Sequence, residues 1–215
     1  MIEDKAKPPP AARPIPNSYR VPNSRIIAGE YPGDMDPVRA KDKINALLSA
    51  DVNVFVDLTE DGELDPYESL LREEAEVHGA SVAYVRLPIR DLRVPTLEEM
   101  QHLQQALSDA EMQGKTAYVH CWGGVGRTGT VIGCHLVERG HSPEDALALV
   151  QQLFGEMSPA KLRAHPKGSP ETNAQREFVR QWALKRSKAK ASAGGSKSDL
   201  PSEKAAGESD SPKAT

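Results

Sequence analysis

The chain has only two cysteines in 215 residues, Cys121 and Cys134. Two thiols cannot build a disulfide framework, and so low a content is typical of a reducing compartment. Long apolar runs are also missing, because no window approaches the ~18 consecutive apolar residues of a membrane-spanning helix. Several prolines lie within the first twenty residues, where a secretory signal would carry an apolar core. The sequence therefore predicts a cytoplasmic protein that neither enters a membrane nor is exported.

Basic residues are not in excess, since 27 Lys and Arg face 31 Asp and Glu, for a net charge of -4. Nucleic-acid-binding proteins show a clustered surplus of Lys and Arg, so we expect no nucleic-acid partner. The chain also lacks histidines at the spacing of a metal site, because His78, His135, His141 and His165 stand apart. We expect no metal and no other cofactor.

Both ends of the chain have few large apolar side chains with which to form a core. Residues 1–18 are proline-rich, and residues 186–215 are rich in Lys, Ala and Ser. Such segments bury too little apolar surface to offset the entropy of ordering, so we predict a disordered lead-in and a disordered tail. Residues 19–185 between them are long enough for one domain, which we expect to be monomeric.

Within this domain, short β-branched runs alternate with helical patterns. The helices have their own start signals: Thr96 and Glu99 form a capping box, and Pro143 follows a capping Ser142. The alternation predicts an α/β fold with a central, mostly parallel sheet of four to five strands, flanked by helices on both faces. The predicted strands are residues 25–28, 52–58, 81–87 and 117–120.

The chemistry-bearing segment follows the last predicted strand. Cys121 is followed by a glycine-rich turn, by Arg127 and then by a helical pattern. A strand, a tight turn and a helix start aim a row of backbone N–H groups at one point, with the positive end of the helix dipole behind them. Such a loop holds a tetrahedral oxyanion, and its glycines permit positive φ angles and close approach. The phosphate-binding residues would be Trp122, Gly123, Gly124, Val125, Gly126 and Arg127.

Two side chains in this segment suit a reaction at phosphorus. The positive potential of the loop favours the thiolate form of Cys121, so we expect a nucleophile at neutral pH. Arg127 offers a planar fork of donors that matches two phosphate oxygens. Cys134 lies seven residues into the following helix, and we expect it to be a packed core thiol.

The spacing of a cysteine, five residues and an arginine resembles the active-site signature of the cysteine-dependent protein phosphatases. His120 and Thr128 also fit that pattern, and residues 87–91 and 169–172 are similar to those of small, atypical dual-specificity phosphatases. The likeness covers roughly residues 20–184. It implies a protein-tyrosine-phosphatase-like fold and metal-independent hydrolysis of a phosphorylated protein or a small phosphomonoester, through a phosphocysteine intermediate.

An alkoxide or phenoxide leaves more readily when a positioned acid protonates it. Asp91 is the predicted acid, because it follows a strand, lies between Pro88 and Pro95, and precedes Cys121 by thirty residues. The resemblance points the same way, and the same carboxylate would then take the proton of the hydrolytic water. Asp57, at the end of another predicted strand, is the reserve candidate.

Three further residues receive site roles. Gln175 points inward on a helix over residues 171–182, where backbone groups or a catalytic water could satisfy its amide. The resemblance to tyrosine phosphatases, in which a glutamine positions that water, favours a catalytic role. Thr128 could donate its hydroxyl to the departing sulfur or cap the helix. His120 is expected to orient the loop through its ring hydrogen bonds, without transferring protons.

The substrate class follows less directly. The loop between Cys121 and Arg127 contains no Lys or Arg, which argues against highly phosphorylated lipids or inositols, although Arg86, Arg90 or Arg93 could face the cleft. We favour phosphotyrosine or dual specificity, with Trp122 as a possible pocket wall. The alternatives are a catalytically silent phosphate-binding module, a sulfur-transfer or arsenate-reducing enzyme, and a scaffold that acts through its tails.

Overall fold

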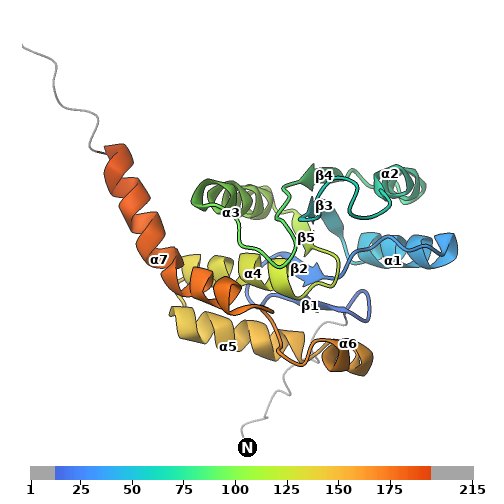
Figure 1. Ribbon diagram of the computed structural model, residues 1–215. Helices are drawn as coiled ribbons and strands as arrows, with labels where there is room; N and C mark the ends of the chain where they lie inside the picture. Colours follow the sequence, from blue (N-terminus) through green and yellow to red (C-terminus); the bar gives the residue numbers. More distant parts are fainter. Residues whose placement is uncertain (1–12, 195–215) are drawn as a thin grey trace, which may run out of the picture.

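The computed structural model describes residues 13–194 of the chain, with side chains described for residues 13–185. The predicted disorder of residues 1–12 and 195–215 lies outside the described part. The described chain folds around one sheet with helices on both faces (Figure 1).

Five strands form this sheet, in the order β1-β2-β5-β3-β4. Strand β1 pairs antiparallel with β2, and all other pairs are parallel. The predicted mostly parallel sheet of four to five strands is confirmed. The strands are β1 (Ser18–Arg20), β2 (Ile26–Gly29), β3 (Val52–Asp57), β4 (Ala83–Arg86) and β5 (Thr116–His120).

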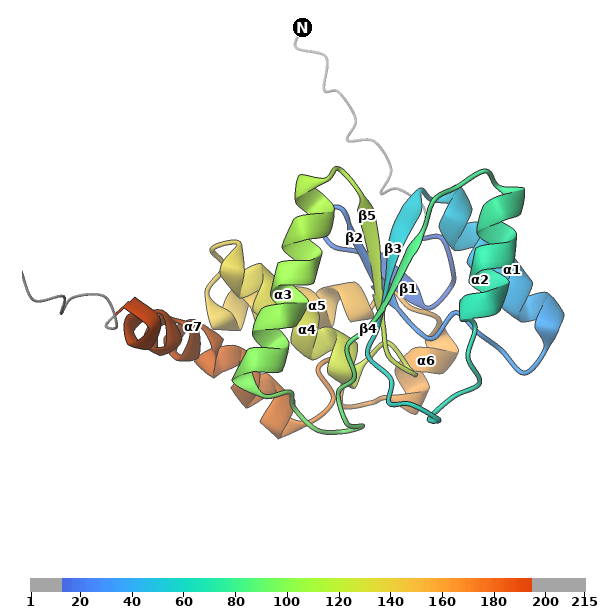
Figure 2. The same ribbon diagram turned by 90° about the horizontal axis from the view of Figure 1, so that it is seen from above.

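The helices divide between the two faces of the sheet, as Figure 2 shows. The larger core cluster packs one face of the sheet against α3 (Leu97–Met112), α4 (Gly126–Glu138), α5 (Pro143–Phe154) and α7 (Asn173–Gly194). The smaller cluster packs the other face against α1 (Pro37–Ser49) and α2 (Glu68–Val77). A short helix, α6 (Pro159–Ala164), lies between α5 and α7 in the chain. The central strands β5 and β3 are buried, so the end of β5 is held rigidly.

The predicted helix starts have the expected caps. Thr96 accepts a hydrogen bond from the Glu99 backbone N–H at 3.2 Å, and the Glu99 carboxylate accepts one from the Thr96 N–H at 2.7 Å. Ser142 accepts from the Asp145 N–H, and Pro143 stands at the first helical position of α5. These caps satisfy amides that have no partner within the helix.

The described residues include structure on both sides of the predicted boundaries, before residue 18 and after residue 186. Ile15 is buried in the smaller core cluster, and Ser18 opens β1 at the edge of the sheet. An edge strand tolerates neighbouring prolines because it lacks a partner on one side. Helix α7 continues to Gly194. Its last part contains few large apolar residues, but Ala, Lys and Arg have a high intrinsic helix propensity.

Candidate active site

The loop between β5 and α4 brings Cys121 to the carboxyl end of the central strand. Cys121 is 3% exposed, and α4 begins five residues later at Gly126. Of the three loop glycines, Gly124 alone has a positive φ, 73°. A Cβ at this position would lie 2.5 Å from the carbonyl oxygen of Gly29. Only glycine fits there, because the loop passes directly over the end of β2.

A cavity of about 300 Å³ opens over this loop. Most of the predicted site residues line it: Asp91, Cys121, Trp122, Gly123, Val125, Gly126, Arg127 and Gln175. Three predicted residues, Gly124, His120 and Thr128, do not line it, and the last two are fully buried behind it. Four lining residues were not given a role by the sequence: Leu92, Lys161, His165 and Glu171.

Arg127 is buried, and part of its guanidinium is already held by the protein. Its Nη1 donates to the carbonyls of Leu58 at 3.3 Å and Ile89 at 3.1 Å. Glu63 binds the end of the fork with both oxygens, at 2.7 Å from Nη1 and 2.6 Å from Nη2. The Nε group is buried and has no partner among the described residues. This donor is therefore unsatisfied until an acceptor, such as an anion, reaches it.

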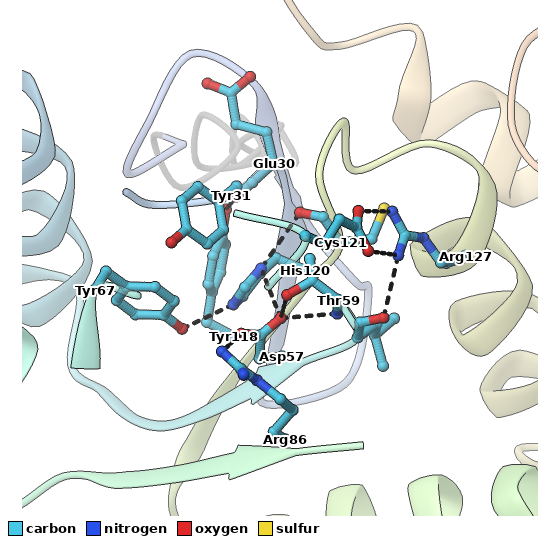
Figure 3. Close-up of polar contacts among 12 residues, drawn as sticks. Glu30, Tyr31, Asp57, Thr59, Tyr67, Arg86, Tyr118, His120, Cys121 and Arg127 are labelled. Carbon is cyan, nitrogen blue, oxygen red and sulfur yellow. Dashed lines mark hydrogen bonds and ion pairs between the residues drawn. The ribbon is translucent and has the colours of Figure 1, made fainter. Parts of the chain in front are cut away.

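Charges around Arg127 keep it in its cationic form. Burial alone would lower the pKa of Arg127, but the hydrogen bonds to Glu63 and the neighbouring Cys121 raise it above its ordinary value. Figure 3 shows the sulfur of Cys121 beside this guanidinium. Sequence reasoning missed Glu63, because it lies in the loop between β3 and α2, far from the signature, with no motif around it.

The two predicted acid candidates lie in different environments. Asp91 is half-exposed, lines the cavity, and has its Oδ1 3.0 Å from Nη2 of Arg127. Asp57 is fully buried and does not line the cavity. Thr59 and Arg86 direct donors at the Asp57 carboxylate (Figure 3). The Tyr84 hydroxyl donates to the same carboxylate. Burial raises the pKa of Asp57, but His120 and the bonds from Tyr84 and Thr59 outweigh it, so the pKa lies below its ordinary value.

His120 connects the loop to a buried group of aromatic side chains. Its Nε2 is 2.7 Å from the Tyr67 hydroxyl, and its Nδ1 is 3.3 Å from the carbonyl of Cys121 (Figure 3). Burial lowers the pKa of His120 to about 4, so the ring is neutral at pH 7. Because the pKa of Tyr67 is raised well above 10 by burial, its hydroxyl stays protonated and can donate to Nε2. Nδ1–H then donates to the Cys121 carbonyl.

Gln175 and Thr128 differ in how their polar atoms are satisfied. The Oε1 of Gln175 accepts from the backbone N–H groups of Glu171 at 3.1 Å and Thr172 at 3.0 Å. Its Nε2 donates to the Arg93 carbonyl at 3.2 Å, which leaves one amide hydrogen for the cavity. The Thr128 hydroxyl is buried without a partner in the described chain. Trp122 is 61% exposed at the cavity mouth.

One wall of the cavity comes from α6 and the segment after it. The imidazole Nδ1 of His165 is 3.1 Å from the Glu171 Oε1. Lys161, four residues before His165, is paired with Glu30 at 2.9 Å. Sequence reasoning considered His165 only as a metal ligand, whereas the spacing of four residues between Lys161 and His165 could have indicated a shared helix face.

Neither a metal site nor a membrane span occurs among the described residues, 13–194. No group of three or more His, Cys, Asp or Glu side chains in this part is arranged to hold a metal ion. No helix within it has the length and apolarity needed to cross a membrane.

The chain is similar to known phosphatases over most of its length. The family model described as "PTP-SAK: Swiss Army Knife protein, DSP-PTPase phosphatase domain" matches residues 25–179. The protein named "Putative tyrosine phosphatase 067L", from Invertebrate iridescent virus 3, is 29% identical over 164 residues. That match covers 74% of this chain, which spans only 62% of the viral protein.

Two solved structures have a similar fold. A glycine-to-alanine variant of Tk-PTP is 26% identical, with a TM-score of 0.58, over 81% of this chain and 98% of the other. PTPMT1, solved in complex with PI(5)P, is 18% identical, with a TM-score of 0.55, over 76% and 94%. At that identity, the second likeness concerns the fold alone.

Proposed function

We propose that this chain, which belongs to the family of DSP-PTPase phosphatase domains, hydrolyses phosphomonoesters through a phosphocysteine intermediate on Cys121. The observation that carries the proposal is that Arg127, whose buried Nε has no hydrogen-bond partner among the described residues, lines the same cavity as Cys121. A buried donor without a partner is costly, and a bound phosphate would remove that cost. The loop amides and the start of α4 add further positive potential at the same point.

The first half-reaction transfers the phosphoryl group to sulfur. The Cys121 thiolate attacks phosphorus, the bond from phosphorus to the ester oxygen breaks, and Asp91 gives that oxygen a proton. Asp91 contacts Nη2 of Arg127 in the ligand-free protein. A phosphate that binds the Nε and Nη2 edge would displace this contact, and Asp91 would become free to protonate the leaving group. We assign the acid role to Asp91, because Asp57 is surrounded by donors away from the cavity.

We infer that the substrate carries one phosphate. The phosphorylated residue is tyrosine, or, for an enzyme of dual specificity, either tyrosine or serine and threonine. Arg86 is held by Asp57 and Asp61, and neither Arg90 nor Arg93 lines the cavity. Lys161 does line the cavity, but Glu30 compensates its charge. The exposed ring of Trp122 at the mouth favours an aryl leaving group, since aromatic rings stack on one another. We further propose a cytoplasmic monomer without a cofactor.

The test is turnover of a generic aryl phosphate by purified protein in the presence of a chelator. The parent should hydrolyse it, Cys121→Ser should lose essentially all turnover, and Asp91→Asn should be slower by about 10² to 10⁴. Asp91→Asn should lose most on substrates with poor leaving groups. Persistent turnover in Cys121→Ser would refute the proposal, and full activity of Asp91→Asn on a poor leaving group would refute the assignment of the acid.

The same variants separate the alternatives. A silent binding module would bind phosphate without turning over any aryl ester. Arsenate reduction would need a second accessible thiol, but Cys134 is fully buried in α4, and burial raises its pKa well above the ordinary value. Phosphoester hydrolysis needs only the Cys121 thiol.

A further inference from the structure

We propose that His165, oriented by Glu171, is the general base of the second half-reaction and takes the proton of the water that hydrolyses the phosphocysteine. This inference rests on the proposed function. It assigns a separate group to the step in which water attacks, and leaves Asp91 the protonation of the leaving group.

The first observation is the pairing of His165 with a carboxylate. Its Nδ1 lies 3.1 Å from Oε1 of Glu171, and both side chains are about three-quarters buried. An ionised carboxylate has no proton to donate and can act only as an acceptor. The contact with Glu171 therefore fixes the proton of His165 on Nδ1. The lone pair of the neutral ring is then on Nε2. A histidine held by a carboxylate through one nitrogen, with the other free to take a proton, is the arrangement of a general base.

The second observation is where the pair lies. A Cβ placed on Gly123 would be 3.5 Å from Nε2 of His165, and one placed on Gly126 would be 3.3 Å from Oε2 of Glu171. The pair therefore lies against both ends of the loop that follows Cys121. Both side chains line the same cavity as Cys121. A water between Nε2 and a phosphoryl group on the sulfur would lie within this cavity.

The third observation is that the other candidates are engaged elsewhere. Gln175 uses both acceptor sites of Oε1 and one of its amide hydrogens on backbone groups. With one hydrogen left, it can hold a water but cannot remove its proton. Asp91 contacts Arg127 at 3.0 Å in the ligand-free protein and has the acid role of the first step, and the experiment below distinguishes it from His165 as the base. Among the described residues lining the cavity, His165 is the ring nitrogen base that remains.

The step balances without another reactant. The water oxygen bonds to phosphorus, the bond from phosphorus to sulfur breaks, and its electron pair returns Cys121 to the thiolate. One water proton moves to Nε2 of His165, whose positive charge is stabilised by Glu171. The imidazolium later gives this proton to solvent, because His165 is partly exposed at the cavity mouth.

Several charged groups face this imidazole. Glu171 comes from the segment before α7, and Lys161 lies one turn earlier on α6. Across the cavity lie Cys121 and Arg127 from the loop and α4, and Asp91 from the segment after β4. Because protonation of His165 removes its lone pair, we expect an acidic limb in kcat that comes from the hydrolysis step.

The experiment measures phosphoenzyme directly, by acid quench after mixing with an aryl phosphate that has a good leaving group. In His165→Gln, phosphoenzyme should accumulate to nearly one equivalent, and kcat should fall by about 10² to 10⁴. The value of kcat/KM should stay near that of the parent, because it reports only the steps up to transfer to sulfur. Glu171→Gln should show the same split with a smaller fall, and the acidic limb of kcat should disappear in His165→Gln. The exposed His102→Gln is the matched control and should behave like the parent.

The outcomes distinguish this inference from the proposed function. If the parent and His165→Gln have equal kcat and equal phosphoenzyme, or if kcat and kcat/KM fall together without accumulation, the base assignment is overturned. A parent that never forms phosphoenzyme overturns the proposed function itself. If Asp91→Asn accumulates phosphoenzyme and His165→Gln does not, Asp91 is the base.

Discussion

Replacement of Glu63 by glutamine should weaken both the fold and the proposed reaction, because Glu63 holds Arg127. The Glu63 side chain is 15% exposed and binds Arg127 through two contacts of 2.6 and 2.7 Å. Glutamine keeps one acceptor but turns the other contact into two facing donors. Loss of one hydrogen bond to a charged group costs about 1.5–3 kcal/mol, and Glu63→Ala should cost about 3–5 kcal/mol, because a buried charge then lacks its partner.

The assay combines urea unfolding at pH 7 with kcat/KM on an aryl phosphate. We expect kcat/KM of Glu63→Gln to fall by about 10- to 100-fold, since a displacement of about 1 Å in a positioning group has effects of this order. Glu68→Gln is the control, because Glu68 pairs with Arg72 on the exposed surface of α2, where such pairs contribute about 0.5 kcal/mol or less. Equal stability and equal kcat/KM of Glu63→Gln and the parent would refute the reasoning.

The pH dependence of this difference can be predicted in sign. Burial raises the pKa of Glu63, but the hydrogen bonds from Arg127 and from the Glu60 N–H outweigh it and leave the pKa below its ordinary value. A carboxyl with a depressed pKa in the folded state stabilises the protein above its unfolded pKa, about 4.3. That contribution is lost as the pH falls through the lower, folded value. The stability difference between the parent and Glu63→Gln should therefore be constant near pH 7 and shrink below about pH 4.

Two further changes test the loop and its support. Gly124→Ala should lower the free energy of unfolding by more than the roughly 1–3 kcal/mol that a left-handed φ costs a non-glycine residue, because its Cβ would meet the Gly29 backbone. It should also abolish turnover. Gly62→Ala is the control in urea unfolding, because Gly62 has a φ of 74° and open space around it and so measures the backbone cost alone. Because burial lowers the pKa of His120 to about 4, the unfolded state binds more protons below pH 6.5, and the unfolding free energy should fall by about 3 kcal/mol between pH 6.5 and 4. His120→Asn should lack that fall, and an equal fall in both proteins would contradict it.

The part of the site that the sequence predicts best is the part that is contiguous. Cys121, the loop glycines and Arg127 lie within seven residues, and the strand before them and the helix after them are both indicated by the local sequence. The parallel sheet was equally accessible, since β-branched runs alternate with helical patterns. Strand β1 was missed, because three residues beside prolines give no alternation that predicts an edge strand.

The support of the site comes from distant segments and left no readable pattern. Glu63, Tyr67, His165 and Glu171 reach Cys121 or Arg127, directly or through a neighbour, only because parallel strands end at one edge and their loops meet there. Each is a common polar residue in a loop or beside a short helix. The local sequence favoured Asp91 over Asp57, but it could not show that Tyr84 and Arg86, from the neighbouring strand β4, engage Asp57.

Three carboxylates lie close to the proposed phosphate site, and their partners explain how a dianion could bind beside them. Glu63 is neutralised by the end of the Arg127 fork, and Glu171 is held by His165. Asp91 also contacts Nη2 of Arg127. It is the one of the three that is half-exposed, and it lies on a segment in which Leu92 has a left-handed φ of 57°. The carboxylate that the proposed reaction requires to change partners is therefore the most exposed of the three, and the two that hold other groups are more deeply buried.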